Sequence, residues 1–160
     1  MTRPFFDFVY SRIMLNEVFG NGGRHERDVK LQLMVFLYYL SLSGAGAKFS
    51  SVAKFFHISK GCARMCFRRV LTSILSLKDE FYFWPDNDAR NELSNKFLVT
   101  HGFPGCVGCI DGTLFNLSTR PSLMGQNFFT RKSCYAIHGL IVCDSECRIN
   151  YICTRKIADV

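Results

Sequence analysis

Long hydrophobic runs are missing from this chain of 160 residues. The longest apolar stretch, residues 33–40, is far shorter than the roughly 20 residues that a membrane-spanning helix needs. We also expect no secretory signal, because Asp7 lies in the N-terminal stretch and no small-residue cleavage site follows an apolar core. Internal repeats and low-complexity segments are absent too. We therefore expect an intracellular globular protein that does not associate with membranes.

Paired metal ligands are scarce, although the chain has eight cysteines. Cys106 and Cys109 have the spacing of a zinc-site pair, but we find no second pair of that type. Cys62 and Cys66 lie one helical turn apart, which is a poor spacing for a zinc-site pair. Because most cysteines stand among Val, Ile and Phe, we interpret them as small buried residues in a reducing compartment. The sequence predicts neither a disulfide scaffold nor a zinc site.

Positive charge is plentiful but confined to one half of the chain. Residues 1–76 contain 11 Lys or Arg against 4 Asp or Glu, whereas residues 77–160 contain 9 of each. A basic half joined to a neutral half suggests that the basic half meets a polyanion. An ordinary solvated basic surface is the alternative.

Residues 1–85 carry helical patterns and form the first of two expected domains. Apolar residues at helical spacing predict helices over residues 5–19 and 26–42, with a glycine-rich turn at 44–47. A short helix over residues 52–57 should follow. Ser59 would then cap a longer helix that runs to Ser76. We interpret this last pair as helix-turn-helix-like.

One face of the longer helix is basic. Lys60, Arg64 and Arg68 recur every four residues and therefore share a face. An apolar stripe is expected on the side that faces the core: Ala63, Cys66, Phe67, Val70, Leu71, Ile74 and Leu75. A recognition helix has this division, with one side docked on the core and a cationic side toward phosphates and base edges. A helical core with a solvated basic face would have it too.

Residues 86–160 form the second expected domain, in which a helix precedes strands. We predict a helix over residues 88–100, with Leu93, Phe97 and Leu98 inward and with Asp86, Asn87 or Asp88 as its cap. Three strands are expected after it: residues 106–110 (resuming at 114–117), 134–142 and 147–153. A tight turn at residues 144–146 would join the last two. The fold class predicted for the whole chain is α+β.

Asp111 ends the first of these strands, and Gly112 follows it. A carboxylate at the tip of a buried strand meets solvent at the sheet edge, where Mg²⁺ accepts such oxygen ligands. Gly112 lets a ligand approach the backbone closely. Alternatively, Asp111 caps a turn, as Asp-Gly often does.

Several blocks resemble, in order, those of the PIF/Harbinger transposases and the nucleases derived from them. The blocks are Trp84-Pro85, Phe103-Pro104-Gly105-Cys106-Val107-Gly108-Cys109-Ile110-Asp111-Gly112-Thr113, Pro121, Phe129-Thr130-Arg131-Lys132 and Tyr135-Ala136-Ile137-His138-Gly139-Leu140-Ile141-Val142-Cys143-Asp144. The resemblance covers about residues 49–153. It implies a DDE-type nuclease with an RNase H-like core, which cleaves DNA phosphodiester bonds in the nucleus with Mg²⁺ or Mn²⁺.

The resemblance also implies roles for particular residues. Asp111 would be the first catalytic, metal-binding carboxylate, and Asp159 lies near the spacing of the second, unless it is there by chance. The family's third carboxylate, a later Glu, has no counterpart here, and two metal ions need more than one carboxylate. We therefore expect a C-terminally incomplete core that a partner protein or second subunit would complete. Arg131 and Lys132 would contact phosphate or remain a solvated pair, and no small-molecule substrate is expected.

The remaining polar residues have plainer interpretations. His138, among apolar residues, is expected to pack in the core, and Asp144 and Glu146 are expected to be solvated in their turn. Three functions follow from the whole pattern. The first is an incomplete transposase-type nuclease, and the second is a non-catalytic DNA-binding remnant that acts through residues 60–68. The third is a structural or partner-binding role, because the strands of an incomplete core need a cover.

Overall fold

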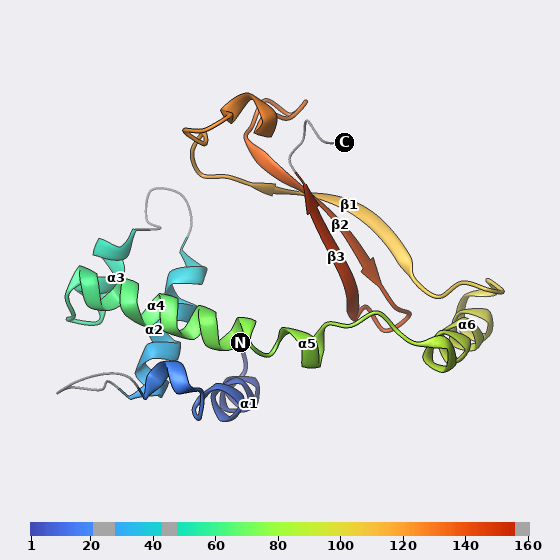
Figure 1. Ribbon diagram of the computed structural model, residues 1–160, viewed down its shortest axis with the longest axis horizontal. Helices are drawn as coiled ribbons and strands as arrows, with labels where there is room; N and C mark the ends of the chain where they lie inside the picture. The colour runs from blue at the N-terminus through green and yellow to red at the C-terminus, as the bar shows by residue number, and fades with distance from the viewer. Residues whose placement is uncertain (21–27, 43–47, 156–160) are drawn as a thin grey trace. The chain divides into compact units, whose positions relative to one another are not determined.

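The computed structural model describes residues 1–20, 28–42 and 48–155, although not the side chain of residue 155. The chain forms two compact units, Met1–Lys78 and Asp79–Val160 (Figure 1). The first unit is helical, and the second combines helices with a small antiparallel sheet. The predicted α+β class is therefore confirmed at this level.

The first unit consists of α1 (Arg3–Ile13), η1 (Glu17–Phe19), α2 (Val29–Ser41), α3 (Phe49–Phe55) and α4 (Lys60–Leu75). The single helix expected over residues 5–19 is wrong. The side chain of Asn16 accepts a hydrogen bond from the amide of Val18, and this cap starts the short helix η1 separately. The start of the helix expected at 26–42 and the turn expected at 44–47 lie outside the described residues.

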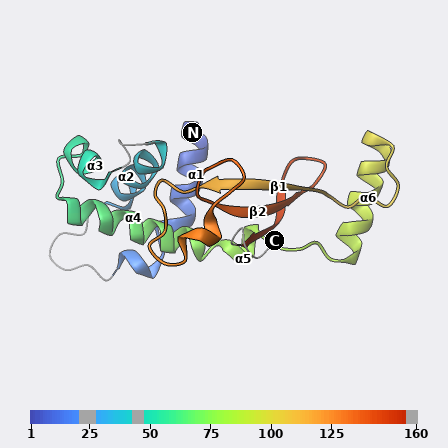
Figure 2. The same cartoon turned by 90° about the horizontal axis from the view of Figure 1, so that it is seen from above.

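Two apolar clusters hold the first unit together, and α2 and α4 contribute to both. One cluster contains the buried residues Ile13, Phe19, Leu33, Phe36 and Val70. The other contains Val35, Val52, Ala53, Ala63 and Cys66. Helices α2, α3 and α4 accordingly pack on one another (Figure 2). Helix α2 contributes side chains to one cluster from one face and to the other cluster from another face, as expected of its nearly continuous apolar sequence.

The apolar stripe of α4 is narrower than expected. Ala63, Cys66 and Val70 are buried, but Leu71 is 37% exposed and Leu75 is 59% exposed. Residues 63, 66, 70 and 73 follow the 3.6-residue period, whereas residues 71 and 75 fall on the same side as 64 and 68. The buried side of α4 is therefore completed by the small polar residue Ser73, and the two leucines lie beside the basic face.

The helices of the second unit are α5 (Lys78–Phe81), α6 (Asn87–His101) and η3 (Gly125–Phe128); α5 begins on the last residue of the first unit. The side chain of Asp86 accepts from the amide of Ala89 at 2.9 Å, as expected of a cap. Gly102 ends α6 with a φ of 74°, in the left-handed region that favours glycine. Phe97 is buried as predicted, but Leu98 is 48% exposed.

The sheet is an antiparallel meander in the order β1-β2-β3, with strands β1 (Cys109–Asn116), β2 (Ala136–Cys143) and β3 (Ile149–Arg155). Three strands were expected, but β1 is continuous through Gly112 instead of stopping at residue 110. It pairs with β2 along its whole length, from Cys109 opposite Cys143 to Asn116 opposite Ala136. This pairing holds the Asp-Gly pair in the strand, where a turn was the alternative.

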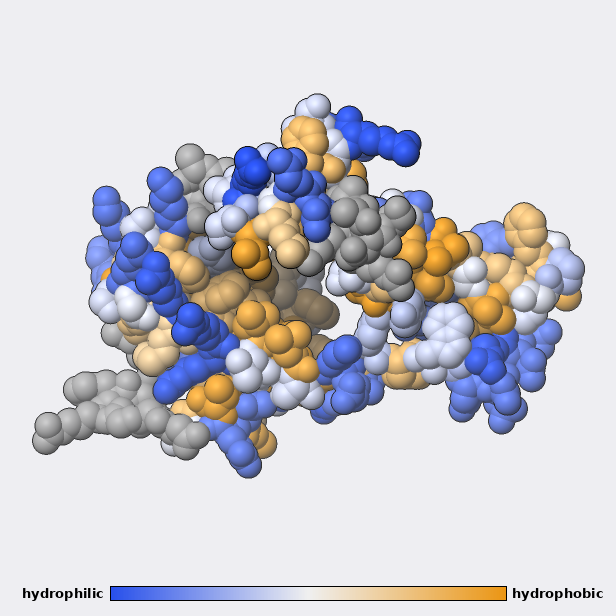
Figure 3. All heavy atoms as spheres, turned by 45° about the horizontal axis from the view of Figure 1, so that its top comes forward, coloured by the Kyte–Doolittle hydropathy of each residue, from blue (hydrophilic) through white to orange (hydrophobic). Residues whose placement is uncertain are grey.

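Both faces of the sheet lack a cover within the described part of the second unit. Ile110 is 66% exposed, and Phe115, Leu140 and Ile152 are exposed as well. No described helix of this unit packs extensively on a strand. The expectation that the first strand is buried is therefore wrong, because burial depends on elements that these residues do not supply. Apolar side chains reach the molecular surface in Figure 3.

A tyrosine partly covers the outer edge of β3. The hydroxyl of Tyr82 donates to the carbonyl of Ile152 at 2.8 Å and accepts from the amide of the same residue. The Tyr82 ring stacks on Tyr151, and Trp84 meets Tyr151 edge to face. The segment before α6 thus satisfies edge groups of β3 that a fourth strand would otherwise use.

Candidate functional site

The basic face of α4 stands opposite its buried face. The amide of Cys62 donates to the hydroxyl of Ser59 at 3.1 Å, so the predicted cap is present. Lys60, Arg64 and Arg68 are exposed. Helix α4 contains no acidic residue to neutralise them. The three sequence-predicted cations of this helix are therefore brought together on an accessible face.

The acid-free region extends well beyond α4. Residues 29–78 include no Asp or Glu and contain eight Lys or Arg. The first unit has 12 Lys or Arg against 4 acids, and the second has 8 against 9, which gives net charges of +8 and −1. An unbroken cationic stretch on a folded unit is the electrostatic requirement for binding a polyanion.

Aromatic packing holds one of these cations in place. The guanidinium of Arg64 lies 5.7 Å from the ring centroid of Phe49, at the start of α3. Phe49 stacks on Tyr39 at 4.4 Å and meets Phe67 edge to face at 5.7 Å. A cation over an aromatic face is attracted by the ring and loses some freedom. Arg64 is thereby positioned between α3 and α4 while its residue stays exposed.

Asp111 occupies a different place from the one predicted. It is the third residue of β1, opposite Ile141, and not the last residue of a strand. Its carboxylate is exposed and accepts from the amide of Gly112 at 2.8 Å. Asp159 lies outside the described residues. Within the described ranges, no three His, Cys, Asp or Glu side chains are placed to hold a metal ion.

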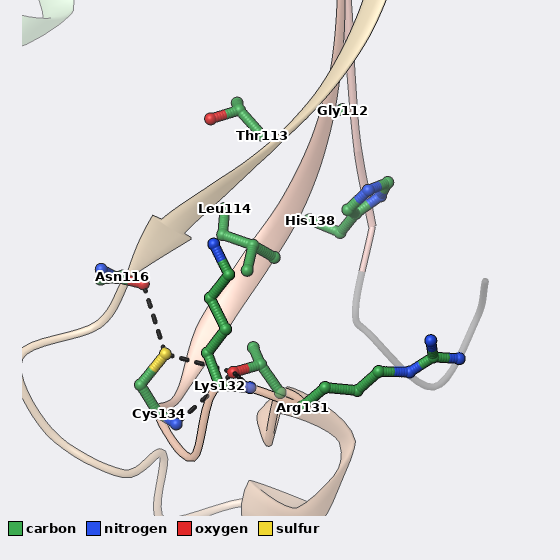
Figure 4. A pocket seen from close by; sticks show the side chains of 9 residues that line it. Gly112, Thr113, Leu114, Asn116, Arg131, Lys132, Cys134 and His138 are labelled. Carbon is green, nitrogen blue, oxygen red and sulfur yellow. Dashed lines mark hydrogen bonds between the residues drawn. The ribbon is translucent and has the colours of Figure 1, made fainter.

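An open pocket of about 900 Å³ lies on the second unit (Figure 4). Arg131 and Lys132 line it, as do Thr113, Asn116 and His138. Figure 4 shows the Lys132 side chain directed toward Leu114 of β1 and the Arg131 side chain extending in a different direction from Lys132. Asp111 does not line the pocket, although Thr113, which shares its face of β1, does. The structure therefore brings Arg131 and Lys132 together, but not with Asp111.

His138 contributes to this pocket instead of packing in a core. It is half-buried and lies opposite Leu114. A Cβ atom on Gly112 would stand 3.1 Å from the imidazole Nε2, so the ring lies over this glycine. Hydrogen bonds at the pocket's other end link Cys134 to Asn116 and to Thr130. Sequence reasoning missed His138 because the cross-strand register was unknown.

Asp144 was expected to be solvated, and this is wrong. Its residue is only 8% exposed. One carboxylate oxygen, Oδ1, accepts from the amides of Glu146 at 2.8 Å and Arg148 at 2.9 Å. Asp144 therefore organises the turn between β2 and β3. Glu146 is exposed, as expected, and pairs with Arg148 and Lys96.

Comparison of this chain with protein-family models, with curated proteins and with solved structures finds no match. Within the described residues, no helix combines the length and the apolar character needed to cross a membrane. The arrangement of the residues must therefore carry the functional argument.

Proposed function

We propose that this chain is part of a DDE-type, transposase-derived nuclease whose first unit binds DNA through α4. The observation that carries the DNA-binding part is the exposed row of Lys60, Arg64 and Arg68 on a helix whose other side is buried. The acid-free stretch of residues 29–78 around this row supports it.

In this proposal α3, the connecting residues and α4 act as a helix-turn-helix. Helix α4 enters the major groove with its basic face, while α2 and α3 support it from behind. Lys60 contacts a phosphate as a point charge, and Arg64 and Arg68 are suited to bidentate contacts with guanine or phosphate. The packing of Arg64 on Phe49 reduces the entropy that this side chain loses on binding.

The nuclease part of the proposal rests on the ordered motifs around Asp111. Catalysis in this class is metal-dependent, with Mg²⁺ or Mn²⁺ supplying charge stabilisation at the scissile phosphate. The described residues do not complete such a site, because Asp111 has no second carboxylate beside it. Any further metal ligands must come from residues outside the described ranges or from a partner protein or second subunit. Arg131 and Lys132 would contact the DNA backbone from their pocket.

A non-catalytic DNA-binding protein is the second candidate. It is favoured by the combination of an organised basic face on α4 and an isolated carboxylate at Asp111. Both candidates share α4 and differ only in whether DNA is cut. Binding and nicking must therefore be measured separately.

Charge reversal on α4 tests DNA binding. We expect the affinity of the full chain for duplex DNA to fall as the salt concentration rises. Each phosphate contact contributes about 0.9 to the slope of log K against log salt concentration, so the loss of two contacts in Arg64→Glu/Arg68→Glu should reduce this slope by about 1.8. Arg3→Glu/Arg12→Glu, an equal charge change on α1, is the control and should change the slope far less. Binding that does not depend on salt, or an equal loss in both variants, would contradict the proposal.

Substitution of the carboxylate tests the nuclease. If the full chain, with any partner it requires, nicks plasmid DNA with Mg²⁺ or Mn²⁺, Asp111→Asn should abolish nicking while Asp88→Asn retains it. Asp88 is a suitable control because it is an exposed acid in the first turn of α6. Nicking that survives in Asp111→Asn would rule out this carboxylate. DNA binding without nicking would favour the second candidate.

A further inference from the structure

Four cysteines gather at one end of the sheet. Cys106 precedes β1 and Cys109 begins it, whereas Cys143 ends β2 and Cys147 lies in the turn that follows. Cys109 and Cys143 are direct partners in the antiparallel register. Sequence spacing alone hid this arrangement, because 33 residues separate the two halves of the cluster.

The backbone at this end of the sheet is closely packed. A Cβ atom on Gly108 would lie 3.0 Å from Cγ1 of Val142 and 3.1 Å from the carbonyl oxygen of Cys143. The missing side chain at Gly108 therefore allows the two strands to approach. The sulfur of Cys143 lies 3.8 Å from the carbonyl oxygen of Cys109. The sulfur of Cys106 lies 3.6 Å from the carbonyl oxygen of Gly108.

The thiols influence one another. The pKa of Cys109 is raised above its ordinary value, first by partial loss of hydration and then by the neighbouring Cys106 and Cys143, with a smaller effect of Cys147. A second thiolate nearby disfavours ionisation of the first, so the three other thiols act on Cys109. Cys109 and Cys147 are exposed and the other two are partly buried, so the prediction that the cysteines are small buried residues is wrong for this cluster. Small reagents in solvent can therefore reach the cluster.

We propose that Cys109 and Cys143 form a reversible disulfide between β1 and β2 through exchange with a small-molecule disulfide such as glutathione disulfide. Directly opposed residues of antiparallel strands have Cα atoms about 4.5–5.5 Å apart. A disulfide requires about 4.4–6.8 Å between Cα atoms, so the strand pairing already meets this condition. A shared metal ion is the competing use of these thiols, but as placed they do not form a metal-binding group.

The exchange proceeds in two balanced steps. The thiolate of one cysteine of the pair attacks one sulfur of glutathione disulfide, which breaks the S–S bond, releases one glutathione thiolate and leaves a mixed disulfide. The thiolate of the other cysteine then attacks the protein sulfur of this mixed disulfide, forms the Cys109–Cys143 bond and releases the second glutathione thiolate. The two thiol protons pass through solvent to the two glutathione thiolates, and both electrons end on glutathione.

Such a bond would fasten β1 two residues before Asp111. The second unit has no buried apolar cluster among its described residues. A cross-link between its first two strands would therefore restrict their motion more than the same cross-link would in a domain with a well-packed core. The bond leaves the first unit unchanged. The inference therefore stands independently of DNA binding by α4.

Thiol mapping of the full chain tests the proposal. The protein is equilibrated with glutathione buffers of increasing disulfide content, quenched with one alkylating agent, reduced and labelled with a second. We expect peptide mass spectrometry to show joint oxidation of Cys109 and Cys143, and the intact chain to lose two hydrogens. Cys109→Ser and Cys143→Ser should each abolish this change. Cys153→Ser should retain it, because Cys153 lies opposite Leu140.

Other outcomes would overturn the inference. Oxidation that pairs Cys106 with Cys109, or Cys143 with Cys147, would assign the reactivity to neighbours along the chain. If disulfides form only between separate molecules, or only as mixed disulfides with glutathione, then β1 and β2 do not hold Cys109 and Cys143 in a position to form an intramolecular disulfide. Stoichiometric zinc in the purified chain, with all four thiols protected until a chelator is added, would assign the cluster to a metal. Mapping of the unsubstituted chain decides these points even if a variant fails to fold.

Discussion

Ser73 lies fully buried in α4, where its hydroxyl has no hydrogen-bond partner among the described residues. A buried hydroxyl without a partner loses its hydration and gains nothing in exchange. Ser73→Ala should therefore raise the free energy of unfolding by about 1 kcal/mol, with added benefit from the higher helix propensity of Ala. Urea unfolding followed by circular dichroism measures it. Thr72→Ala, at an exposed position, estimates the propensity effect alone, and an equal gain there would contradict our explanation.

Gly139 illustrates a contact between strands that no local pattern reveals. A Cβ atom at this position would lie 2.4 Å from Cε2 of Phe115, whose ring covers the glycine. Gly139→Ala should thus destabilise the sheet by about 1–3 kcal/mol through overpacking. Thermal unfolding should show the loss, and the double variant with Phe115→Ala should recover part of it. Equal stability of Gly139→Ala and the unsubstituted protein would mean that the exposed ring simply moves aside.

Residues whose partners lie nearby in sequence were the ones that could be predicted. Ser59 and Asp86 cap their helices as expected, because a cap bonds an amide three residues away. His138, by contrast, lies over Gly112, and Cys109 faces Cys143, because strand register brings distant residues together. The basic face of α4 could be predicted from spacing, whereas the cysteine cluster and the polar pocket could not.

The turn between β2 and β3 is the element that depends most on one side chain. Asp144 accepts two amide hydrogen bonds there while its own amide donates to the carbonyl of Arg148. Asp144→Ala should destabilise the sheet by roughly 1–3 kcal/mol, because it removes the acceptor of the Glu146 and Arg148 amides. Asp144→Asn keeps an acceptor oxygen and should cost clearly less. Amide hydrogen exchange in β2 and β3 distinguishes them, and identical exchange in both variants would exclude this role.

The periodicity of apolar residues predicted which segments form helices and strands. It did not predict where these elements begin and end or which of their side chains are buried. The pattern of residues 5–19 did not reveal that the Asn16 cap starts a separate short helix. In β1, an apolar composition predicted burial, yet Ile110 is exposed because no described element lies over it. Composition states what a strand could bury, and only the neighbouring elements decide whether it does.

The two units differ in what holds them together, and this predicts different behaviour in isolation. Both apolar clusters belong to Met1–Lys78. A chain that ends at Lys78 should therefore unfold cooperatively, remain monomeric and retain salt-dependent DNA binding. Residues 79–160 alone should associate as concentration rises, because their sheet exposes apolar side chains. Sedimentation velocity and thermal melts of both fragments check this. A non-cooperative first fragment or a monomeric, cooperatively folded second one would contradict it.

The confinement of both clusters to the first 78 residues also matters while the protein is being made. Ribosomes add roughly 5–20 residues per second, and N-terminal domains generally fold first. The first unit contains every residue of its own two clusters, so it is expected to fold while the later strands are still being synthesised. The contact of Tyr82 with Ile152, in contrast, has to wait until 70 more residues have been added. Under the proposed function, the basic helix would thus be able to bind DNA before the strand that carries Asp111 has been synthesised.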